Sequence, residues 1–196
     1  MRRIFIAINL PEKIRKNLAN QQLRWADLPC RWTKEENLHI TLAFLGYLND
    51  EELVDLCKIT REVASRHEPF MISLKKIIYG PSTSSGQAQN RAPRMVWVEG
   101  ENSKELAELQ KDLEKENFTP YRREFLRETG AGRKYAPHIT LGRLKQWEFN
   151  KIEPGERPQI NEDISLTFEA KSIDVMESDL KRGGPEYVII ETCQLE

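Results

Sequence analysis

The chain has 196 residues, of which 39% are hydrophobic and 31% are charged, and its formal net charge is −1. This composition predicts a soluble, folded protein and excludes a disordered chain. No apolar run reaches the roughly 18 residues needed to span a bilayer, so we expect no membrane segment. A protein that grips long nucleic acid is usually clearly basic, so any contact with nucleic acid should be local.

The cysteines favour a reducing compartment, so we expect a cytoplasmic location. Cys30, Cys57 and Cys193 are far apart, odd in number and form no CxxC pair. Buried free thiols are the expected state of such residues.

The first third of the chain predicts strands and a helix. Residues 3–9 (RIFIAIN) form an apolar strand, and Pro11, Glu12 and Lys13 end the run too early for a signal peptide. A helix begins at Pro11, and a short strand is expected near residues 31–33. Residues 37–45 predict a further strand that ends at Gly46.

The middle of the chain alternates helices, strands and one polar loop. Asn49 and Asp50 are typical of a helix N-cap region, and the apolar pattern continues to about Ser65. Strands are expected at residues 70–79 and 94–99, and a helix at residues 103–116. Residues 80–93 are polar, Gly, Pro or Ala, without a large apolar side chain, and predict a loop, more simply a disordered insertion than an ordered element.

The last third is expected to be mainly β. Residues 121–134 contain five basic residues and a Gly-Ala-Gly, which predicts a second irregular loop, either an insertion or a basic flap. Strands are expected at 135–144, 164–168, 172–177 and 187–192, the last two joined by a turn at residues 183–185. Without a regular βαβ alternation, we predict one α+β domain over residues 1–196 with mainly antiparallel sheets.

A short repeat suggests internal symmetry. The tetrapeptide HITL begins at His39 and again at His138, 99 residues later. A strand and then a helix precede each copy. The two strands begin at Arg3 and Arg94, 91 residues apart. We therefore expect two similar lobes related by an approximate two-fold axis, with about eight extra residues in the 121–134 loop.

Strand alternation gives each repeat a chemical face. Residues i and i+2 of a strand point to the same side. His39 and Thr41 should therefore project together, with the intervening Ile40 facing the core, and His138 and Thr140 should do the same. If the lobes face each other, two His–Thr pairs meet across a cleft.

Two opposed histidines suit the hydrolysis of a cyclic phosphodiester. Histidine can act as acid or base near neutral pH, and threonine hydroxyls can bind the phosphate oxygens. No metal or other cofactor is required. Two alternatives are that these histidines are structural strand residues, or that they bind zinc, although no further ligands with the usual spacing are visible. His67 lacks a partner motif and is expected to be structural.

These motifs and their flanks resemble the 2H phosphoesterase superfamily, and in particular the LigT-like RNA 2′,3′-cyclic phosphodiesterases, also called 2′-5′ RNA ligases. The resemblance covers nearly the whole chain. It is carried by residues 3–8 (RIFIAI), 36–46 (ENLHITLAFLG), 93–98 (PRMVWV), 137–143 (PHITLGR), 177–180 (ESDL) and 184–187 (GPEY).

The resemblance implies a bilobal fold with a cleft between two antiparallel sheets with outer helices. It implies metal-independent hydrolysis of RNA 2′,3′-cyclic phosphate ends to 2′-phosphomonoesters, and in some members reversible 2′-5′ ligation. It assigns His39 as the proton donor and His138 as the proton acceptor, with Thr41 and Thr140 binding the phosphate. RNA ends or cyclic nucleotides are the expected partners of a chain that we expect to be a monomer.

Several points stay open at this stage. Arg143 is a candidate substrate-binding residue, but it lies five positions after His138 and would face away on an unbroken strand, unless Gly142 permits a twist or bulge. Phe44, Tyr47 and Trp32 are candidates for base stacking, although strand aromatics are usually core. Alternative functions are a phosphodiesterase for a small nucleotide such as ADP-ribose cyclic phosphate, and a non-catalytic RNA-end binder.

Overall fold

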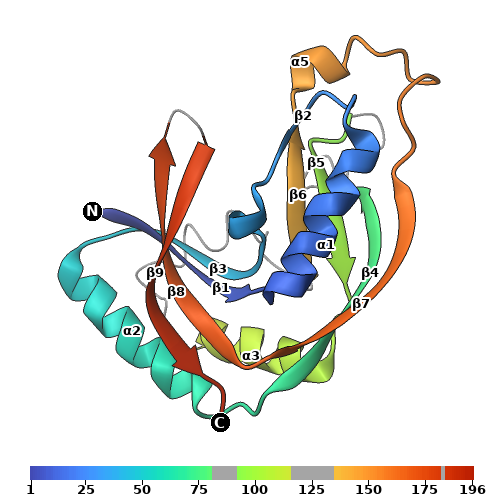
Figure 1. The fold of residues 1–196 in the computed structure, drawn as a ribbon. Helices are drawn as coiled ribbons and strands as arrows, with labels where there is room; N and C mark the ends of the chain where they lie inside the picture. Colours follow the sequence, from blue (N-terminus) through green and yellow to red (C-terminus); the bar gives the residue numbers. More distant parts are fainter. Residues whose placement is uncertain (81–91, 116–134, 182–183) are drawn as a thin grey trace.

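The computed structural model describes residues 1–80, 92–115, 135–181 and 184–196 (Figure 1). The strands are β1 (Arg2–Asn9), β2 (Cys30–Trp32), β3 (His39–Leu48), β4 (Phe70–Tyr79), β5 (Met95–Gly100), β6 (His138–Leu144), β7 (Asn161–Ala170), β8 (Ser172–Lys181) and β9 (Gly184–Gln194). The helices are α1 (Glu12–Gln22), α2 (Asp50–Ala64), α3 (Lys104–Lys115) and the short α5 (Gln146–Phe149), with single 3₁₀ turns η1 (Leu23–Trp25) and η2 (Glu35–Asn37).

The strands that the structure describes form one antiparallel sheet with the order β7-β4-β5-β6-β3-β1-β8-β9, and β2 pairs with β6. Figure 1 shows this sheet as two arms. The arms join at β3 and β6 through the pair formed by Ile40 and Ile139. The predicted antiparallel α+β fold is confirmed, with the two half-sheets hydrogen-bonded to each other at their common edge.

The strand order has the two-fold symmetry that the repeat suggests. β3 and β6 lie at the centre, and β1 and β5 flank them. The two halves of the sequence are nevertheless interleaved: β4, from the first half, pairs with β5, while β8, from the second half, pairs with β1. Each arm of the sheet therefore contains strands from both halves of the chain.

Local sequence accounts for the helices. Asn49 caps α2 with a reciprocal capping box, because its side chain accepts from the Glu52 N–H (2.9 Å) and Glu52 accepts from the Asn49 N–H (2.8 Å). α3 buries Leu106, Leu109 and Leu113 on one face, as expected from their spacing. α1 contacts β6, and α3 contacts β3, so each of these helices packs on a motif strand of the other sequence half.

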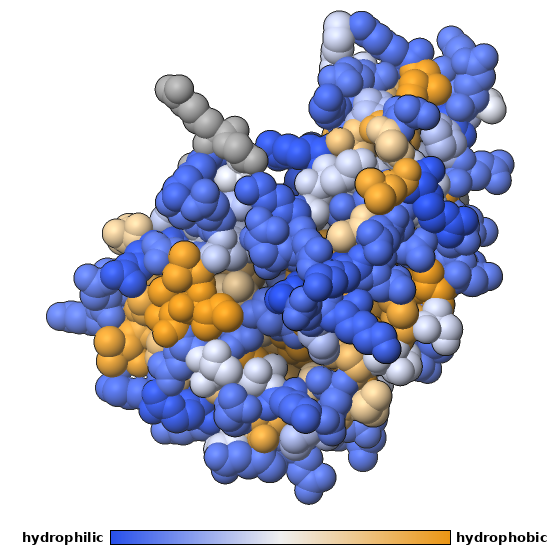
Figure 2. Space-filling view, in the orientation of Figure 1, coloured by the Kyte–Doolittle hydropathy of each residue, from blue (hydrophilic) through white to orange (hydrophobic). Residues whose placement is uncertain are grey.

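The core lies behind the motif strands. Ile40, Leu42, Ile139 and Leu141 are at most 1% exposed, as the alternation predicted. Figure 2 shows a mainly hydrophilic surface with separate apolar areas. None of the helices among the described residues is long and apolar enough to cross a membrane.

Some boundaries differ from the predictions. Gly46 does not end its strand: it lies inside β3 with a φ of 76°, next to a register shift, and the strand continues to Leu48. The strand expected at 135–144 begins at His138, and α5 was not predicted. Most of the 80–93 loop, the whole 121–134 loop and position 183 of the predicted turn lie outside the described residues.

Candidate active site

The two repeated motifs meet where the half-sheets join. Ile40 lies opposite Ile139 in an antiparallel pair, and both side chains are buried. The residues on either side of such a pair face the other side of the sheet. The histidine and threonine of both motifs therefore share one face.

A pocket of about 110 Å³ opens on this face. It contains all five site residues predicted from the sequence, three cationic side chains and, among the described residues, no carboxylate. It is lined by Arg31, Trp32, Thr33, Lys34, Asn37, His39, Thr41, Phe44, His138, Thr140, Arg143, Gly184, Pro185 and Tyr187.

A register shift follows the threonine of β3. Ala7 of β1 pairs with Thr41, but the next partner, Ile6, pairs with Ala43. Leu42 therefore has no partner on β1, as in a β-bulge.

The same shift occurs on β6. Trp97 of β5 pairs with Thr140, and Val96 pairs with Gly142, which leaves Leu141 unpaired on β5. Trp97 thus corresponds to Ala7, and the flanking strands are offset by 90 residues rather than by the 91 predicted from their arginines. Nine extra residues, not eight, therefore separate strand from motif in the second half.

The two shifts turn the following side chains towards the pocket. Phe44 and Arg143, each five positions after its histidine, line it together with the histidines. The bulge considered at Gly142 thus brings Arg143 round to the motif face. Tyr47 is 62% exposed and is not part of the lining, whereas Trp32 is.

Gly142 is needed for a second reason. Its Cα lies opposite Trp32 of β2, and a Cβ there would meet the Cys30 Sγ at 2.4 Å and the Trp32 ring at 2.9 Å. Only a residue without a side chain lets β2 pair this closely with β6.

Backbone and aromatic contacts fix the ring of His39. Its Nδ1 lies 2.8 Å from the carbonyl oxygen of Asn37, and its Nε2 lies 3.0 Å from Thr41 Oγ1. The ring packs against Phe5 (5.0 Å between centroids) and edge-on against Tyr187 (5.2 Å). Because Nδ1 donates to a carbonyl, Nε2 of the neutral ring is the acceptor, and it faces the pocket.

Asn37 connects this ring to the far end of the sheet. Its side-chain amide donates to the carbonyl oxygen of Pro185 at the start of β9 (2.9 Å), and its backbone carbonyl accepts from His39. Residue 37 therefore ties the first motif to the strand that carries Tyr187.

His138 is held by an equivalent backbone contact but has different neighbours. Its Nδ1 lies 3.0 Å from the carbonyl oxygen of Ala136, again two residues earlier. The ring stacks on Trp97, with 3.9 Å between centroids. Its Nε2 is likewise the atom available for proton transfer.

Burial keeps both histidines neutral in the protein by itself. It lowers the pKa of His39 from 6.5 to about 4, although the Asn37 carbonyl opposes the shift, and His138 adds a small repulsion. Burial also lowers the pKa of His138, opposed by the Ala136 carbonyl. Loss of solvation disfavours the imidazolium ion, so an anion bound in the pocket would be needed to restore it.

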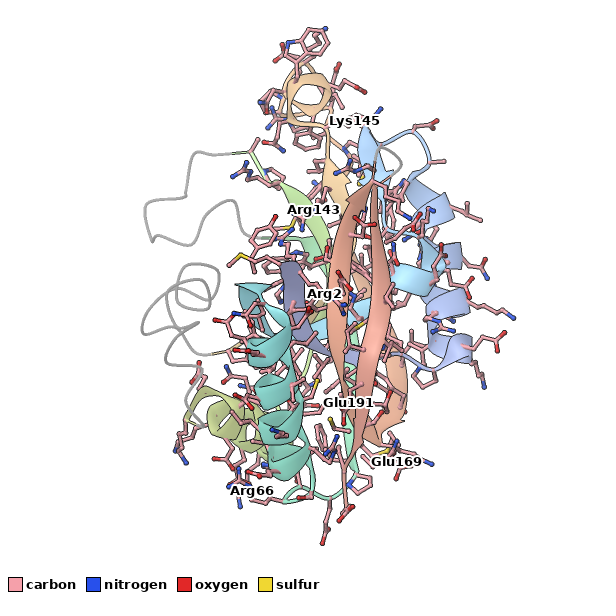
Figure 3. The ribbon with its side chains drawn as sticks, turned by 90° about the vertical axis from the view of Figure 1, so that its left-hand side faces the viewer. Arg2, Arg66, Arg143, Lys145, Glu169 and Glu191 are labelled. Carbon is pink, nitrogen blue, oxygen red and sulfur yellow. The ribbon has the colours of Figure 1, made fainter. Side chains whose placement is uncertain are left out.

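Arg143 lies near the end of β6. In Figure 3 it lies between Lys145, next to α5, and Arg2 of β1. Burial raises the pKa of Tyr187 on β9, and the positive charges of Arg143 and Arg3 oppose this rise. No carboxylate of the described residues pairs with Arg143, and the guanidinium contacts the Met95 sulfur at 3.6 Å.

Three residues of the site were not predicted from the sequence as site residues. Trp97, Tyr187 and Asn37 each contact a histidine of a motif, yet each was predicted only as part of a strand and of a stretch that resembles the family. Residue 97 could have been found from the symmetry, because it occupies on β5 the place of Ala7 on β1. Tyr187 could not, because its contact depends on how β9 reaches the first motif.

The cysteines and His67 do not line the pocket. Cys57 and Cys193 are buried free thiols, and Cys30 is half-buried beside Gly142. His67 lies 3.3 Å from Asp112 of α3 and does not line the pocket. Among the described residues, no group of three or more His, Cys, Asp or Glu side chains is arranged to hold a metal ion.

Comparison with known proteins agrees with this architecture. The family model of LigT-like phosphoesterases matches residues 8–88. The RNA 2′,3′-cyclic phosphodiesterase of Methanocaldococcus jannaschii is 30% identical, with 96% of this chain and 98% of the relative covered. The enzyme of that name from Thermotoga maritima is 28% identical and covers 99% and 96%.

Solved structures show the same fold. A protein of Thermus thermophilus superposes with a TM-score of 0.80 at 27% identity, covering 98% of this chain and 97% of the other. LigT of E. coli complexed with 3′-AMP superposes with a TM-score of 0.74 at 22% identity, covering 99% and 98%. With near-complete coverage of a relative at 30% identity, the chain belongs to the family of LigT-like phosphoesterases.

Proposed function

We propose that this protein hydrolyses the 2′,3′-cyclic phosphate ends of RNA to 2′-phosphomonoesters. One observation carries the proposal: two histidines from symmetric strands present Nε2 to a single cationic pocket, each oriented by a carbonyl two residues earlier. The names of the relatives, RNA 2′,3′-cyclic phosphodiesterases, support the substrate.

His138 is the proposed base. Its neutral Nε2 takes a proton from water as the water oxygen attacks phosphorus. A lowered pKa keeps this nitrogen unprotonated at neutral pH, as the role requires. Stacking on Trp97 holds the ring in place during the transfer.

His39 is the proposed acid. As the bond between phosphorus and the 3′ oxygen breaks, His39 Nε2–H donates its proton to that oxygen, leaving the phosphate on the 2′ oxygen. The ring must first be protonated, and burial lowers its pKa and so disfavours this step before substrate binds. A bound phosphate anion supplies the compensating charge, so substrate binding itself prepares the acid.

Thr41, Thr140 and Arg143 are the proposed substrate-binding residues. Before substrate binds, the Thr41 hydroxyl donates to His39 Nε2. Protonation of this nitrogen would release the hydroxyl to donate to a non-bridging phosphate oxygen. Thr140 occupies the symmetric position, and Arg143, farther along β6, adds a positive charge to the rest of the substrate site.

We propose 2′-5′ ligation as a further reaction of the same arrangement. A 5′-hydroxyl of RNA in the place of water would attack the cyclic phosphate and form a 2′-5′ bond, with the same two proton transfers. Because no separate energy source takes part in this scheme, the reaction would be reversible.

Phosphorus NMR of the product tests the proposal. A uridine dinucleotide with a 2′,3′-cyclic phosphate end should give a 2′-phosphomonoester, in the presence or absence of EDTA. The double variant His39→Ala, His138→Ala should be inactive while keeping its circular dichroism spectrum. A 3′-phosphate product, persistent turnover by the double variant, or loss of activity on chelation with recovery on adding zinc would contradict the mechanism.

A further inference from the structure

The short strand β2 places a second arginine beside Arg143. Arg31 pairs directly with Arg143 across the antiparallel β2–β6 ladder. Cys30 and Trp32 of β2 face the side where they would meet a Cβ at position 142. Strand alternation therefore puts Arg31 on the opposite side, together with Arg143, and both arginines line the pocket.

This arrangement of charge is unfavourable in the protein alone. Like charges directly opposite each other on an antiparallel pair repel, with side chains about 5 Å apart at Cβ. Both arginines are exposed, and neither has a carboxylate partner within the described chain. By contrast Lys34, the third cation of the lining, already lies 3.8 Å from Glu36. Two arginines side by side, without a carboxylate partner among the residues that the structure describes, form a site for an anion.

The arginine pair is offset from the reaction centre. Arg143 lies three residues beyond Thr140 with one residue taken up by the bulge, a span of roughly 7–10 Å at about 3.3 Å per strand residue. This distance is on the scale of one nucleotide step. A phosphate next to the one that reacts would lie within reach of the pair.

Resting on the proposed function, we propose that Arg31 and Arg143 form a second phosphate subsite, which binds the phosphate on the 5′ side of the terminal nucleotide. The subsite selects substrates with that phosphate, such as RNA ends, over simple cyclic mononucleotides. Arg31 is thus a specificity residue rather than a catalytic one. The phosphate recognised is either a diester that links two nucleotides or a terminal 5′-phosphate.

Four substrates separate these cases: adenosine 2′,3′-cyclic phosphate, its 5′-phosphorylated form, the ApA dinucleotide with a cyclic end, and that dinucleotide with an uncharged methylphosphonate linkage. Arg31→Gln should reduce kcat/KM for ApA about tenfold more than for the mononucleotide. The methylphosphonate dinucleotide should resemble the mononucleotide. An effect on the 5′-phosphorylated mononucleotide as large as on ApA identifies a terminal phosphate as sufficient.

The control is Lys111→Gln, which removes one exposed positive charge from α3, outside the pocket. It should leave all four rates unchanged. Arg31→Lys should give an intermediate loss, because it keeps the charge but not the planar fork. Equal loss by Arg31→Gln on all substrates, or on none, overturns the subsite.

A binding measurement keeps this test independent of turnover. Calorimetry with the 2′-phosphorylated products of the mononucleotide and of ApA should show the same selective loss in Arg31→Gln. If the wild-type protein turns over none of the substrates, the proposed function fails, and this binding difference alone decides the subsite. Equal affinities of wild type and variant for the ApA product would overturn it.

Discussion

The strands β3 and β6 carry the same four residues and the same register shift, but they hold their histidines in different surroundings. His39 lies among Phe5, Tyr187 and the Thr41 hydroxyl, whereas His138 stacks on Trp97. The duplication supplies two histidines whose pKa values burial lowers in the same direction, and only their neighbours differ. Symmetry thus provides the geometry of the proposed reaction, and the differing neighbours are what distinguishes the two histidines.

The largest expected effect separates the acid role of His39 from the base role of His138. In a substrate with sulfur in place of the 3′ oxygen, the leaving group needs no proton. His39→Ala should then recover on the order of a hundredfold of its lost activity, because only the acid has become dispensable. His138→Ala should recover almost none.

Steady-state rates of both variants on the oxygen and sulfur substrates measure this difference. Recovery by His138→Ala instead would reverse the assignment of acid and base. Equal recovery by both would show that the histidines do not divide the two proton transfers.

A smaller effect concerns the residue after the shift, which is Ala43 on β3 and Gly142 on β6. Gly142→Ala should destabilise the protein by about 1–3 kcal/mol, because its Cβ would collide with Cys30 and Trp32. It should also weaken substrate binding by displacing Arg143. Denaturant unfolding and KM measure the two effects.

Gly155→Ala is the matched control, since nothing lies within 4 Å of a Cβ there. It should leave both stability and KM unchanged. A Gly142→Ala variant as stable as this control would show that β2 does not depend on the glycine.

The smallest expected effect is on stability as a function of pH. The pKa of His39 is lowered to about 4 in the folded protein, against 6.5 in the unfolded chain, and that of His138 is also lowered. Between these values the unfolded chain binds more protons, so the stability from this source is fully present above pH 6.5 and falls as the pH falls towards 4.

Chemical denaturation between about pH 5 and pH 6.5 isolates this effect, because carboxyl groups with ordinary or lowered pKa values stay largely ionised there. His39→Asn should flatten the dependence, and His138→Asn should do so less. A wild-type stability that does not change over this range would contradict the burial argument.

Local patterns in the sequence predicted much of the fold and the histidine and threonine residues of the candidate site. Alternation placed His39 with Thr41, and the spacing of Leu106, Leu109 and Leu113 gave the inner face of α3. Gly142 even indicated where a bulge could turn Arg143 towards the pocket.

What could not be predicted depends on contacts between distant strands. The pairing of Arg31 with Arg143 exists only because β2 crosses to the other arm of the sheet. The hydrogen bond from Asn37 to Pro185 joins residues 148 positions apart, and it requires β9 to begin beside the first motif. No local pattern encodes such register, since many pairings would satisfy the same alternation.

The interleaving of the two sequence halves in the sheet has a consequence for fragments of the chain. A fragment that ends after β4 would keep β1 and β3 but lose β8, which pairs with β1, and it would leave β4 without β5. A half-chain with one motif could complete its sheet only by taking strands from a second copy, as in a domain-swapped dimer. A single chain is in effect such a dimer on one polypeptide, because strands of both sequence halves complete each arm of the sheet.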